Sequence, residues 1–237
     1  MASEQTPPAI GGYILAGGKS SRMGTDKALL RLAGKPLIEH AVTKLRRICA
    51  EVHILSSNPA LAPYAPLVPD LHPGCGPIGG MESALTHSSH DWNLFLPVDL
   101  PFLPAAFLDA WVRNTLADAP RNKRIALFNV DGVPQPTVLL IHREAAPYIV
   151  QAVARGDFKL FPTIEFIGQG LAARQNLRLE DVFRVTNWAS GVSAAASAEA
   201  SQRITSEQRA TQALWFANLN TPQDFAEAEA HIAALDT

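Results

Sequence analysis

Residues 12–27, GYILAGGKSSRMGTDK, join an apolar run to a loop that is rich in glycine and positive charge. The run GYILA (12–16) is continuous, rich in β-forming residues and bounded by glycines, which predicts a buried strand. In the loop, Gly17 and Gly18 allow the backbone to turn sharply and to present bare N–H groups to a ligand. The cations that can neutralise phosphate there are Lys19, Arg22 and Lys27. A strand that runs directly into such a loop predicts a phosphate-binding site.

The loop differs from two well-known phosphate loops. No Gly-Lys-Ser/Thr follows four residues after a glycine, as a Walker A motif requires, and Gly17, Gly18 and Gly24 lack the spacing of the dinucleotide fingerprint. The alternative is an ordinary strand-to-helix connection with scattered surface charge. The density of glycines and cations in this short segment favours the phosphate site.

Short and long apolar segments alternate along much of the chain. Short runs predict strands, and longer runs with apolar side chains at helical spacing predict helices. Strands are expected at 51–57, 65–70, 91–104 and 124–130, and helices at 35–50, after 76 and at 104–118. This alternation is typical of βαβ units, so the expected fold class is α/β, with a three-layer, mostly parallel sheet and helices on both faces.

The pattern changes after about residue 132. A strand and then a helix are expected between 132 and 156, and residues 213–220 predict a last strand before a helix that starts near Thr221. Residues 189–212 are rich in Ala and Ser and have almost no bulky apolar side chains. They predict an exposed helix, a mobile loop or disorder, and we favour a mobile insertion.

The composition argues against several classes of protein. A formal net charge of −2 disfavours non-specific nucleic-acid binding, and no apolar run approaches the length of a membrane span. The first ten residues have neither the basic start nor the apolar stretch of a signal peptide, so a cytoplasmic globular protein is expected. Cys49 and Cys75 lie in dissimilar contexts and are expected to be free thiols.

Two aspartates lie at or near the ends of predicted strands. Asp99 lies between the apolar segments NLFLPV and LPFLP, where a carboxylate must be paired, hydrogen-bonded or bound to a metal. Asp70 ends the strand LVPD. Ligands of open parallel sheets bind beyond the carboxyl ends of the strands, so both carboxylates are expected near the glycine loop. The alternatives are that Asp99 caps a helix and that Asp70 only forms a turn.

The glycine loop also resembles a family signature. LAGGKSSRMGTDK (15–27) matches without a break the pattern L-A-G-G-x-S-x-R-M-G-x-x-K of the molybdenum cofactor guanylyltransferases, MobA-like nucleotidyltransferases with a Rossmann-like domain. The resemblance covers residues 12–155 and 214–235 well and fades between about 160 and 212. The other segments that resemble the family are GKPLIEHAV, PDLHPGCGPIGGMESAL, PVDLPFLP, QPTVLL and ANLNTPQDF.

The resemblance implies a reaction and its partners. The family transfers GMP from GTP to the terminal phosphate of molybdenum cofactor (molybdopterin), releases pyrophosphate and depends on Mg²⁺. We therefore expect one nucleotidyltransferase domain over 1–237, with a nucleotide-binding part at 12–130 and an acceptor-binding part at 131–237. The expected partners are GTP, the molybdenum cofactor and, transiently, proteins that handle that cofactor; nucleic acid and membranes are not expected.

The resemblance also assigns roles to residues. Asp99 is expected to hold Mg²⁺, and Asp70 to accept hydrogen bonds from the guanine N1–H and exocyclic amino group. The residues expected in catalysis are Lys27, Arg22 and Asp99. Those expected to bind GTP are Leu15, Ala16, Gly17, Gly18, Lys27, Ser56, Asp70 and Asp99.

Three positions carry weaker assignments. Ser56, with Asn58 nearby, stands where family members often have asparagine directly after the second strand. Asn218 and Asn220 flank Leu219 in the predicted last strand, so they are expected to share a face and to line the acceptor side. Asn220 could instead cap the helix that starts at Thr221.

Two other kinds of function stay open. A CTP-using cofactor cytidylyltransferase or a sugar-phosphate nucleotidyltransferase has the same fold; Gly17 favours guanine, because the related cytidylyltransferases tend to have LAAG there. Outside the enzymes, a non-catalytic nucleotide-binding partner in cofactor delivery is the alternative. The complete glycine loop and Asp99 argue against this alternative, because a protein without catalytic activity need not keep both.

Overall fold

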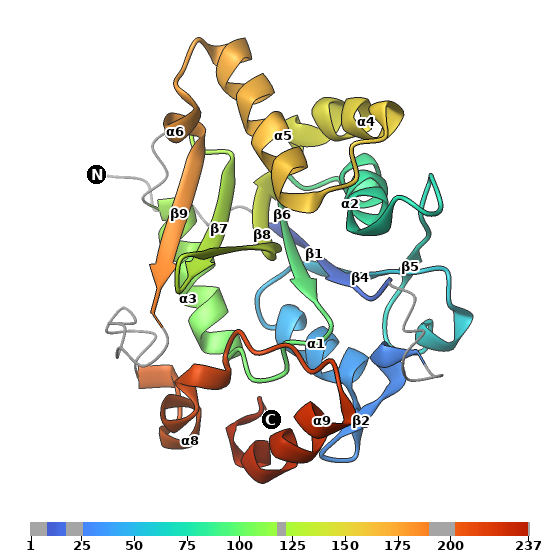
Figure 1. The fold of residues 1–237 in the computed structure, drawn as a ribbon, viewed down its shortest axis with the longest axis vertical. Coiled ribbons are helices and arrows are strands. Elements are labelled where there is room, and N and C mark those ends of the chain that lie inside the picture. The colour runs from blue at the N-terminus through green and yellow to red at the C-terminus, as the bar shows by residue number, and fades with distance from the viewer. Residues whose placement is uncertain (1–8, 18–25, 118–121, 190–201, 237) are drawn as a thin grey trace.

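A computed structural model describes residues 9–17, 26–117, 122–189 and 202–236 (Figure 1). Within these residues, seven strands form one sheet in the order β5-β4-β1-β6-β8-β7-β9. Only β8 runs against its neighbours, so the expected mostly parallel α/β sheet is confirmed. The strands are β1 (Ile10–Leu15), β4 (Glu51–Leu55), β5 (Leu67–Val68), β6 (Trp92–Pro97), β7 (Ile125–Val130), β8 (Val133–His142) and β9 (Phe183–Trp188).

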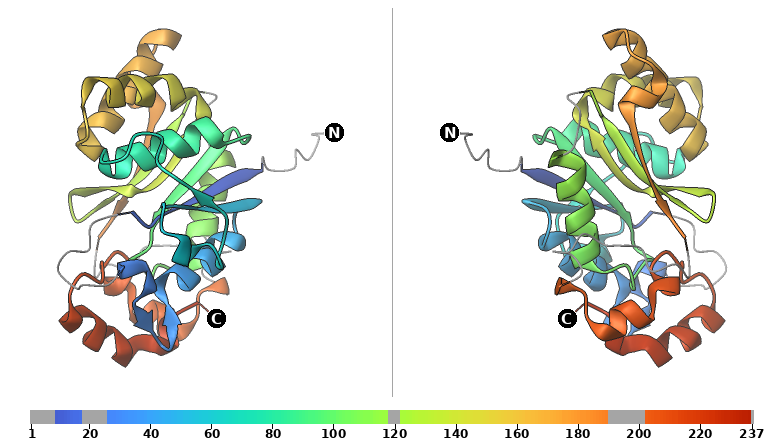
Figure 2. Two further views of the ribbon diagram at one scale, coloured as in Figure 1. Left: turned by 90° about the vertical axis from the view of Figure 1, so that its right-hand side faces the viewer. Right: turned by 90° about the vertical axis from the view of Figure 1, so that its left-hand side faces the viewer.

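Helices cover both faces of the sheet (Figure 2). One apolar core forms under α1 (Leu37–Arg46) and α3 (Ala105–Ala117), and a second forms under α2 (Gly76–His87), α4 (Ala146–Arg155) and α5 (Leu160–Gln175). A two-stranded ribbon of β2 (Arg31–Leu32) and β3 (Lys35–Pro36) precedes α1. The shorter elements are η1 (Lys27–Leu29), η2 (Pro59–Leu61), η3 (Arg143–Ala145), α6 (Leu179–Val182), α8 (Ser206–Ala210), η4 (Gln212–Leu214), α9 (Pro222–Ala228) and η5 (Glu229–Ala234).

Strand β1 lies inside the sheet, between β4 and β6, and its side chains are buried on both faces. Tyr13 packs into one core and Ile14 into the other, and both side chains are almost fully buried. A Cβ atom at Gly12 would lie 2.9 Å from Cys49 Sγ, so glycine is needed for this close approach. Cys49 and Cys75 are buried free thiols, as expected. Among the described residues, no helix is long and apolar enough to cross a membrane.

The expected last strand is wrong. Residues 213–220 do not join the sheet: η4 ends at Leu214, and the chain then crosses the carboxyl edge of the sheet, where the Leu219 N–H donates to the Asp99 carbonyl at 3.1 Å. The apolar side chains that suggested a strand serve packing instead. Trp215 is buried and stacks on Trp188 with ring centroids 4.9 Å apart.

Part of the Ala/Ser-rich stretch 189–212 is packed against the domain. Ile204 is buried, and the Arg203 guanidinium lies 2.6 Å from the buried Asp109 carboxylate. A capping box of Thr205 and Gln208 begins α8. Residues 190–201 lie outside the described residues, so the expected insertion and the limits of its two-part domain stay predictions.

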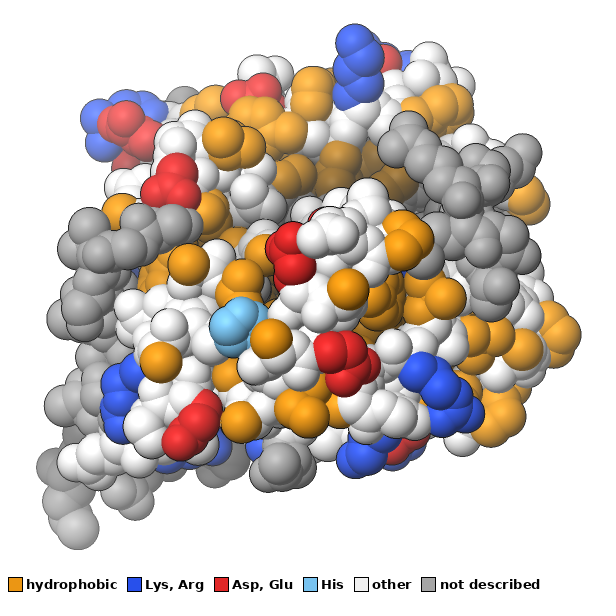
Figure 3. Space-filling view, turned by 60° about the horizontal axis from the view of Figure 1, so that its bottom comes forward, with side chains coloured by type: hydrophobic (Ala, Val, Ile, Leu, Met, Phe, Trp, Pro, Cys, Tyr) orange, Lys and Arg blue, Asp and Glu red, His pale blue; other side chains and the backbone are white. Residues whose placement is uncertain are grey.

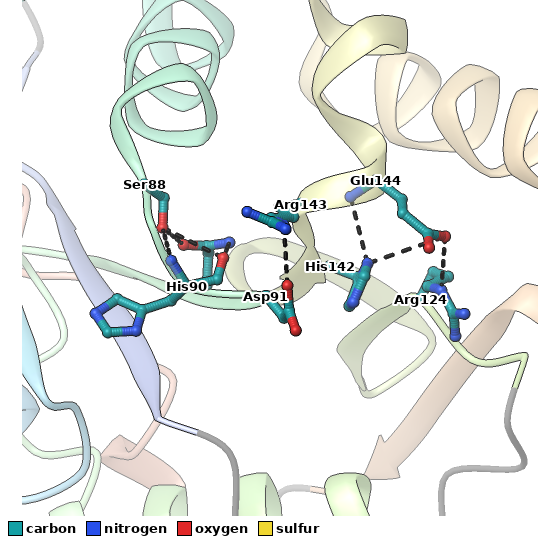
Figure 4. Close-up of polar contacts among 8 residues, drawn as sticks. Ser88, His90, Asp91, Arg124, His142, Arg143 and Glu144 are labelled. Atoms are coloured by element: carbon teal, nitrogen blue, oxygen red, sulfur yellow. Dashed lines mark hydrogen bonds and ion pairs between the residues drawn. The ribbon is translucent and has the colours of Figure 1, made fainter.

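The turn between β8 and α4 is fixed by polar contacts at the amino edge of the parallel strands (Figure 4). Arg143 Nε lies 2.8 Å from Asp91 Oδ1, and Arg124 Nε donates to Glu144 Oε2 at 2.9 Å. His142 Nδ1 accepts the Glu144 N–H at 3.3 Å. This cluster lies at the end of the sheet opposite to the glycine loop.

We expect the folded protein to lose stability as the pH falls from 7.5 to 5.5. Burial lowers the pKa of His40, His53 and His142, so the unfolded chain takes up protons below about pH 6.5 before the folded chain does. Each histidine then lowers the free energy of unfolding by up to about 1.4 kcal/mol per pH unit, until the pH reaches the pKa of that histidine in the folded protein. Urea denaturation at several pH values measures this effect; His40→Gln should show a shallower fall, and a flat profile for the unsubstituted chain would contradict the expectation.

Candidate active site

The candidate site lies where the parallel strands end. Leu15, at the end of β1, pairs with Pro97 at the end of β6, and the Val98 N–H donates to the Leu15 carbonyl at 3.2 Å. On the other side of β1, Leu15 pairs with Leu55, the last residue of β4. The segments that follow β1, β4, β5 and β6 therefore leave the sheet together. They carry Gly17, Ser56, Asp70 and Asp99, respectively.

Lys27 joins three distant segments of the chain. It begins η1, whose N-cap Asp26 accepts the Ala28 N–H at 3.0 Å. Its ammonium group donates to Asp99 Oδ2 at 2.5 Å and to Asn220 Oδ1 at 2.6 Å. The side chains of Lys27 and Asp99 are only 20% and 17% exposed. The glycine loop, the segment after β6 and the segment before α9 thus meet at one cation.

Asp99 retains a free oxygen. Its Oδ1 atom is buried and accepts no hydrogen bond from any residue in the described ranges. A buried carboxylate oxygen without a partner is costly, and a hard cation would satisfy it. The described residues contain no cluster of three or more His, Cys, Asp or Glu side chains that could enclose a metal. This donor set suits a hard divalent cation that would take its other ligands from a bound molecule and from water.

A buried lysine holds the segment after Asp99. Lys44 Nζ donates to the carbonyls of Leu100 and Pro101, each at 3.1 Å, and lies 3.8 Å from Asp236 Oδ2. Burial lowers the Lys44 pKa to about 8. Asp236 in turn accepts the Ala105 N–H at 2.9 Å. Sequence reasoning missed this pair, although a lysine among the apolar positions of α1 was the available signal.

Asp70 lies over the first turns of α2. Cβ atoms added at Gly79 and Gly80 would lie 3.9 and 3.7 Å from its carboxyl group, so the two glycines let the helix backbone lie close to Asp70. Burial raises the Asp70 pKa. The next residue is fixed by α2, because the Leu71 N–H donates to Ser83 Oγ at 2.8 Å. Sequence reasoning did not find Ser83, whose hydroxyl also donates to the Gly79 carbonyl.

Ser56 contributes to a chain of contacts that reaches the glycine loop. Its Oγ accepts the Asn58 N–H at 3.1 Å, and Asn58 Nδ2 donates to Asp26 Oδ2 at 2.6 Å. Asn58 therefore supports Asp26, the residue directly before Lys27. Sequence reasoning had noted Asn58 only as a neighbour of Ser56. The side-chain Oδ1 atom of Asn58 accepts the Ala60 N–H at 3.0 Å and caps η2.

The other predicted residues lie in different places, and some lie outside the described residues. Gly17 is exposed, and a Cβ atom there would meet only the Leu55 carbonyl, at 3.7 Å. Asn220 lies at Lys27, and Asn218 lines a cavity of about 140 Å³. Residues 213–220 do not form a strand, so the alternation from which a shared face was predicted is absent. Thr221, not Asn220, caps α9. Residues outside the described ranges are Gly18, Lys19, Arg22 and Gly24.

Charge on the neighbouring surface is mixed. On the face at the bottom of Figure 1, which α8 and α9 help to form, Lys and Arg side chains are scattered among acidic and apolar ones (Figure 3). Within the described residues, Lys27 is the cation that lies against Asp99.

We expect Asp236→Asn to lower the free energy of unfolding by about 3 kcal/mol, because it leaves the buried Lys44 ammonium without its carboxylate. Chemical denaturation at pH 7 measures the change. Asp91→Asn is the matched control, since the Asp91–Arg143 pair is more than half exposed and should contribute less than about 1 kcal/mol. Equal effects of the two substitutions would refute the structural role given to Lys44.

Comparison with protein families gives a match over most of the chain. The model of the MobA-like NTP transferase domain matches residues 12–165. A molybdenum cofactor guanylyltransferase of Serratia proteamaculans (strain 568) is 35% identical over an alignment of 166 residues, which covers 67% of this chain and 81% of that protein. One from Yersinia pestis (strain Pestoides F) is 32% identical over 166 residues, covering 68% and 82%.

Solved structures support the fold. The molybdopterin-guanine dinucleotide biosynthesis protein A of Archaeoglobus fulgidus superposes with a TM-score of 0.64 at 20% identity, covering 95% of this chain and 100% of that one. The 2-C-methyl-D-erythritol 4-phosphate cytidylyltransferase of Thermus thermophilus gives 0.55 at 17% identity, covering 95% and 98%. Enzymes that use different nucleotides share this architecture, so the fold alone does not select the base.

Proposed function

The chain belongs to the MobA-like NTP transferase family, and on that premise we propose that it transfers GMP from GTP to the terminal phosphate of molybdenum cofactor, releasing pyrophosphate. The observation that carries the proposal is the contact of Lys27 with Asp99. It joins the lysine of the glycine loop to a carboxylate with a free oxygen, at the edge of the sheet where Asp70 also lies.

The nucleophile needs no general base. A phosphate monoester has its second pKa near 6, so at pH 7 the acceptor phosphate is already mostly ionised. The barrier lies in bringing two polyanions together and in stabilising the charge on the departing pyrophosphate. Positioning and electrostatic stabilisation provide most of the catalysis in such reactions.

The residues of this chain divide that work. The N–H groups of the glycine loop and Lys27 bind the triphosphate, and Arg22 adds a planar, bidentate cation. Enzymes of this kind usually need a divalent metal; we propose Mg²⁺, with Asp99 as its protein ligand. The ion would supply positive charge that neutralises the phosphate oxygens during transfer.

Asp70 is the residue that we propose to recognise the base. A carboxylate accepts two parallel N–H bonds, and guanine offers its N1–H and amino group side by side. Gly79 and Gly80 place no side chain against the carboxyl group of Asp70. A cytidylyltransferase or sugar-phosphate nucleotidyltransferase is the alternative that base preference tests. The cytoplasmic location and the transient cofactor-handling partners expected from the sequence stay predictions.

We expect calorimetric titration with Mg²⁺ to show binding of GTP in preference to CTP and ATP. ITP, which lacks the exocyclic amino group, should bind about tenfold more weakly than GTP, a loss of about 1.4 kcal/mol. In Asp70→Asn the preference for GTP over ITP should disappear, whereas Asp91→Asn, at the far edge of the sheet, should keep it. Tightest binding of CTP would refute the guanylyl assignment.

We expect Asp99→Asn to reduce pyrophosphate release from GTP and molybdopterin by on the order of 1000-fold, the rate equivalent of several kcal/mol of charge stabilisation. Its melting temperature should stay close to that of the unsubstituted chain, because asparagine has the shape of aspartate and keeps a side-chain oxygen that can accept from Lys27 Nζ. Lys27→Met should weaken GTP binding and slow the reaction. A normal rate for Asp99→Asn across a range of Mg²⁺ concentrations would remove Asp99 from the site.

A further inference from the structure

The loop that joins β5 to α2, residues 69–75, carries Asp70 (Figure 1). The Asp70 carboxylate forms no hydrogen bond or ion pair with the residues that the structure describes. Burial raises the pKa of this carboxyl group, and no ion pair in the described part of the chain lowers it. The position of the carboxylate therefore depends on how the backbone of the loop is held.

The loop is packed directly against the first half of α2. A Cβ atom added at Gly79 would lie 3.1 Å from the His72 carbonyl oxygen and 3.0 Å from Cys75 Cβ. The hydrogen bond from the Leu71 N–H to Ser83 Oγ adds a directed contact one turn further along the helix. The backbone on both sides of Asp70 thus takes its position from α2.

A second directed contact joins the loop to a buried acid. His72 Nδ1 lies 2.7 Å from Glu82 Oε2, and the Glu82 side chain is only 2% exposed, whereas that of His72 is 60% exposed. Because an ionised carboxylate only accepts hydrogen bonds, the imidazole carries a proton on Nδ1 and donates it. His72 is the partner that the described ranges provide for the Glu82 carboxylate.

This pair is a poor means of stabilising the core. A carboxylate that leaves water loses its solvation, and an exposed partner restores little of that free energy because water screens the attraction. Ile78 and Leu85, one turn before and one turn after Glu82 on α2, are apolar and buried. An apolar side chain would suit position 82 at least as well. What Glu82 adds is a directed bond to the loop.

We propose that Glu82, acting through His72, is a positioning residue that holds the Asp70 carboxylate ready to recognise the base. This inference rests on the proposed function, because that function assigns the base to Asp70. A carboxylate that accepts two parallel N–H bonds gains affinity when its position is fixed before the ligand arrives. The glycine loop and Lys27 bind the triphosphate elsewhere, so the His72–Glu82 pair should affect selectivity among bases and not phosphate binding.

The test is calorimetric titration of Glu82→Met with GTP and ITP. We expect the preference for GTP over ITP to fall from about tenfold to about twofold, with the loss confined to GTP, because only GTP uses both bonds to Asp70. The melting temperature should be unchanged or higher, since methionine replaces a buried charge with an apolar side chain of similar length. Lower base selectivity without lower stability is the combination that a merely structural role does not produce.

Variants of His72 give the matching half of the test. His72→Ala should reduce the GTP preference as Glu82→Met does, but it should also lower the melting temperature, because it leaves a buried carboxylate without its donor. His72→Asn keeps an N–H donor near the position of Nδ1 and should retain most of the preference. In the Glu82→Met background, His72→Ala should change the preference no further. The matched control is His87→Ala, an exposed histidine at the other end of α2, which should bind both nucleotides normally.

Hydrogen exchange of residues 69–75 in the free protein measures the same contact without a nucleotide. The loop amides should exchange severalfold faster in Glu82→Met than in the unsubstituted chain or in His87→Ala, because one of the loop's two directed bonds to α2 is lost.

The outcomes separate this inference from the proposed function. Unchanged exchange in Glu82→Met, or an unchanged preference for GTP over ITP, would overturn the role given to Glu82 and leave the guanylyl function in place. If the unsubstituted chain binds CTP most tightly, and Glu82→Met both loses that preference and exchanges faster, the guanylyl function fails and the positioning role of Glu82 stands.

Discussion

The parallel pairing of β1 with β6 is the constraint on which the site depends. Because Leu15 lies opposite Pro97, the glycine loop and the Asp99 segment leave the sheet side by side, and Lys27 can reach the Asp99 carboxylate. A shift of this register by one residue would turn Tyr13 and Ile14 toward the wrong cores. The packing that stabilises the fold therefore also fixes the geometry of the proposed phosphate site.

A second layer of contacts holds the site from behind. The buried Lys44 fixes the two carbonyls after Asp99, Ser83 fixes the residue after Asp70, and Asn58 supports the residue before Lys27. Each of these side chains uses its hydrogen bonds on the chain itself. The side chains that they position, by contrast, keep unused capacity, as the free Oδ1 of Asp99 shows. That difference separates the supporting groups from those available to a substrate.

The sequence predicted those parts of the molecule that depend on local pattern. Strand β1, the alternation of strands and helices and the meeting of Lys27 with Asp99 at one edge follow from apolar periodicity and from the rule for parallel sheets. The strand predicted at 213–220 was wrong because an apolar run has the same sequence pattern in two cases. Its side chains can pack against a sheet, or its backbone can pair as a strand of that sheet. The roles of Lys44, Ser83 and the His72–Glu82 pair depend on contacts between different segments, which no local pattern reveals.

The contact between Lys27 and Asn220 spans 193 residues, and this separation has a consequence for biosynthesis of the protein. Chains emerge from the ribosome amino end first, so β1, β4 and β6 can pair long before residues 220 and 236 have been translated. Until then Lys27 lacks one partner, and the Lys44 ammonium lacks its carboxylate. Completion of the site is thus one of the last events of synthesis. The central strands of a nascent chain are therefore translated before Asn220 and Asp236, which complete the site.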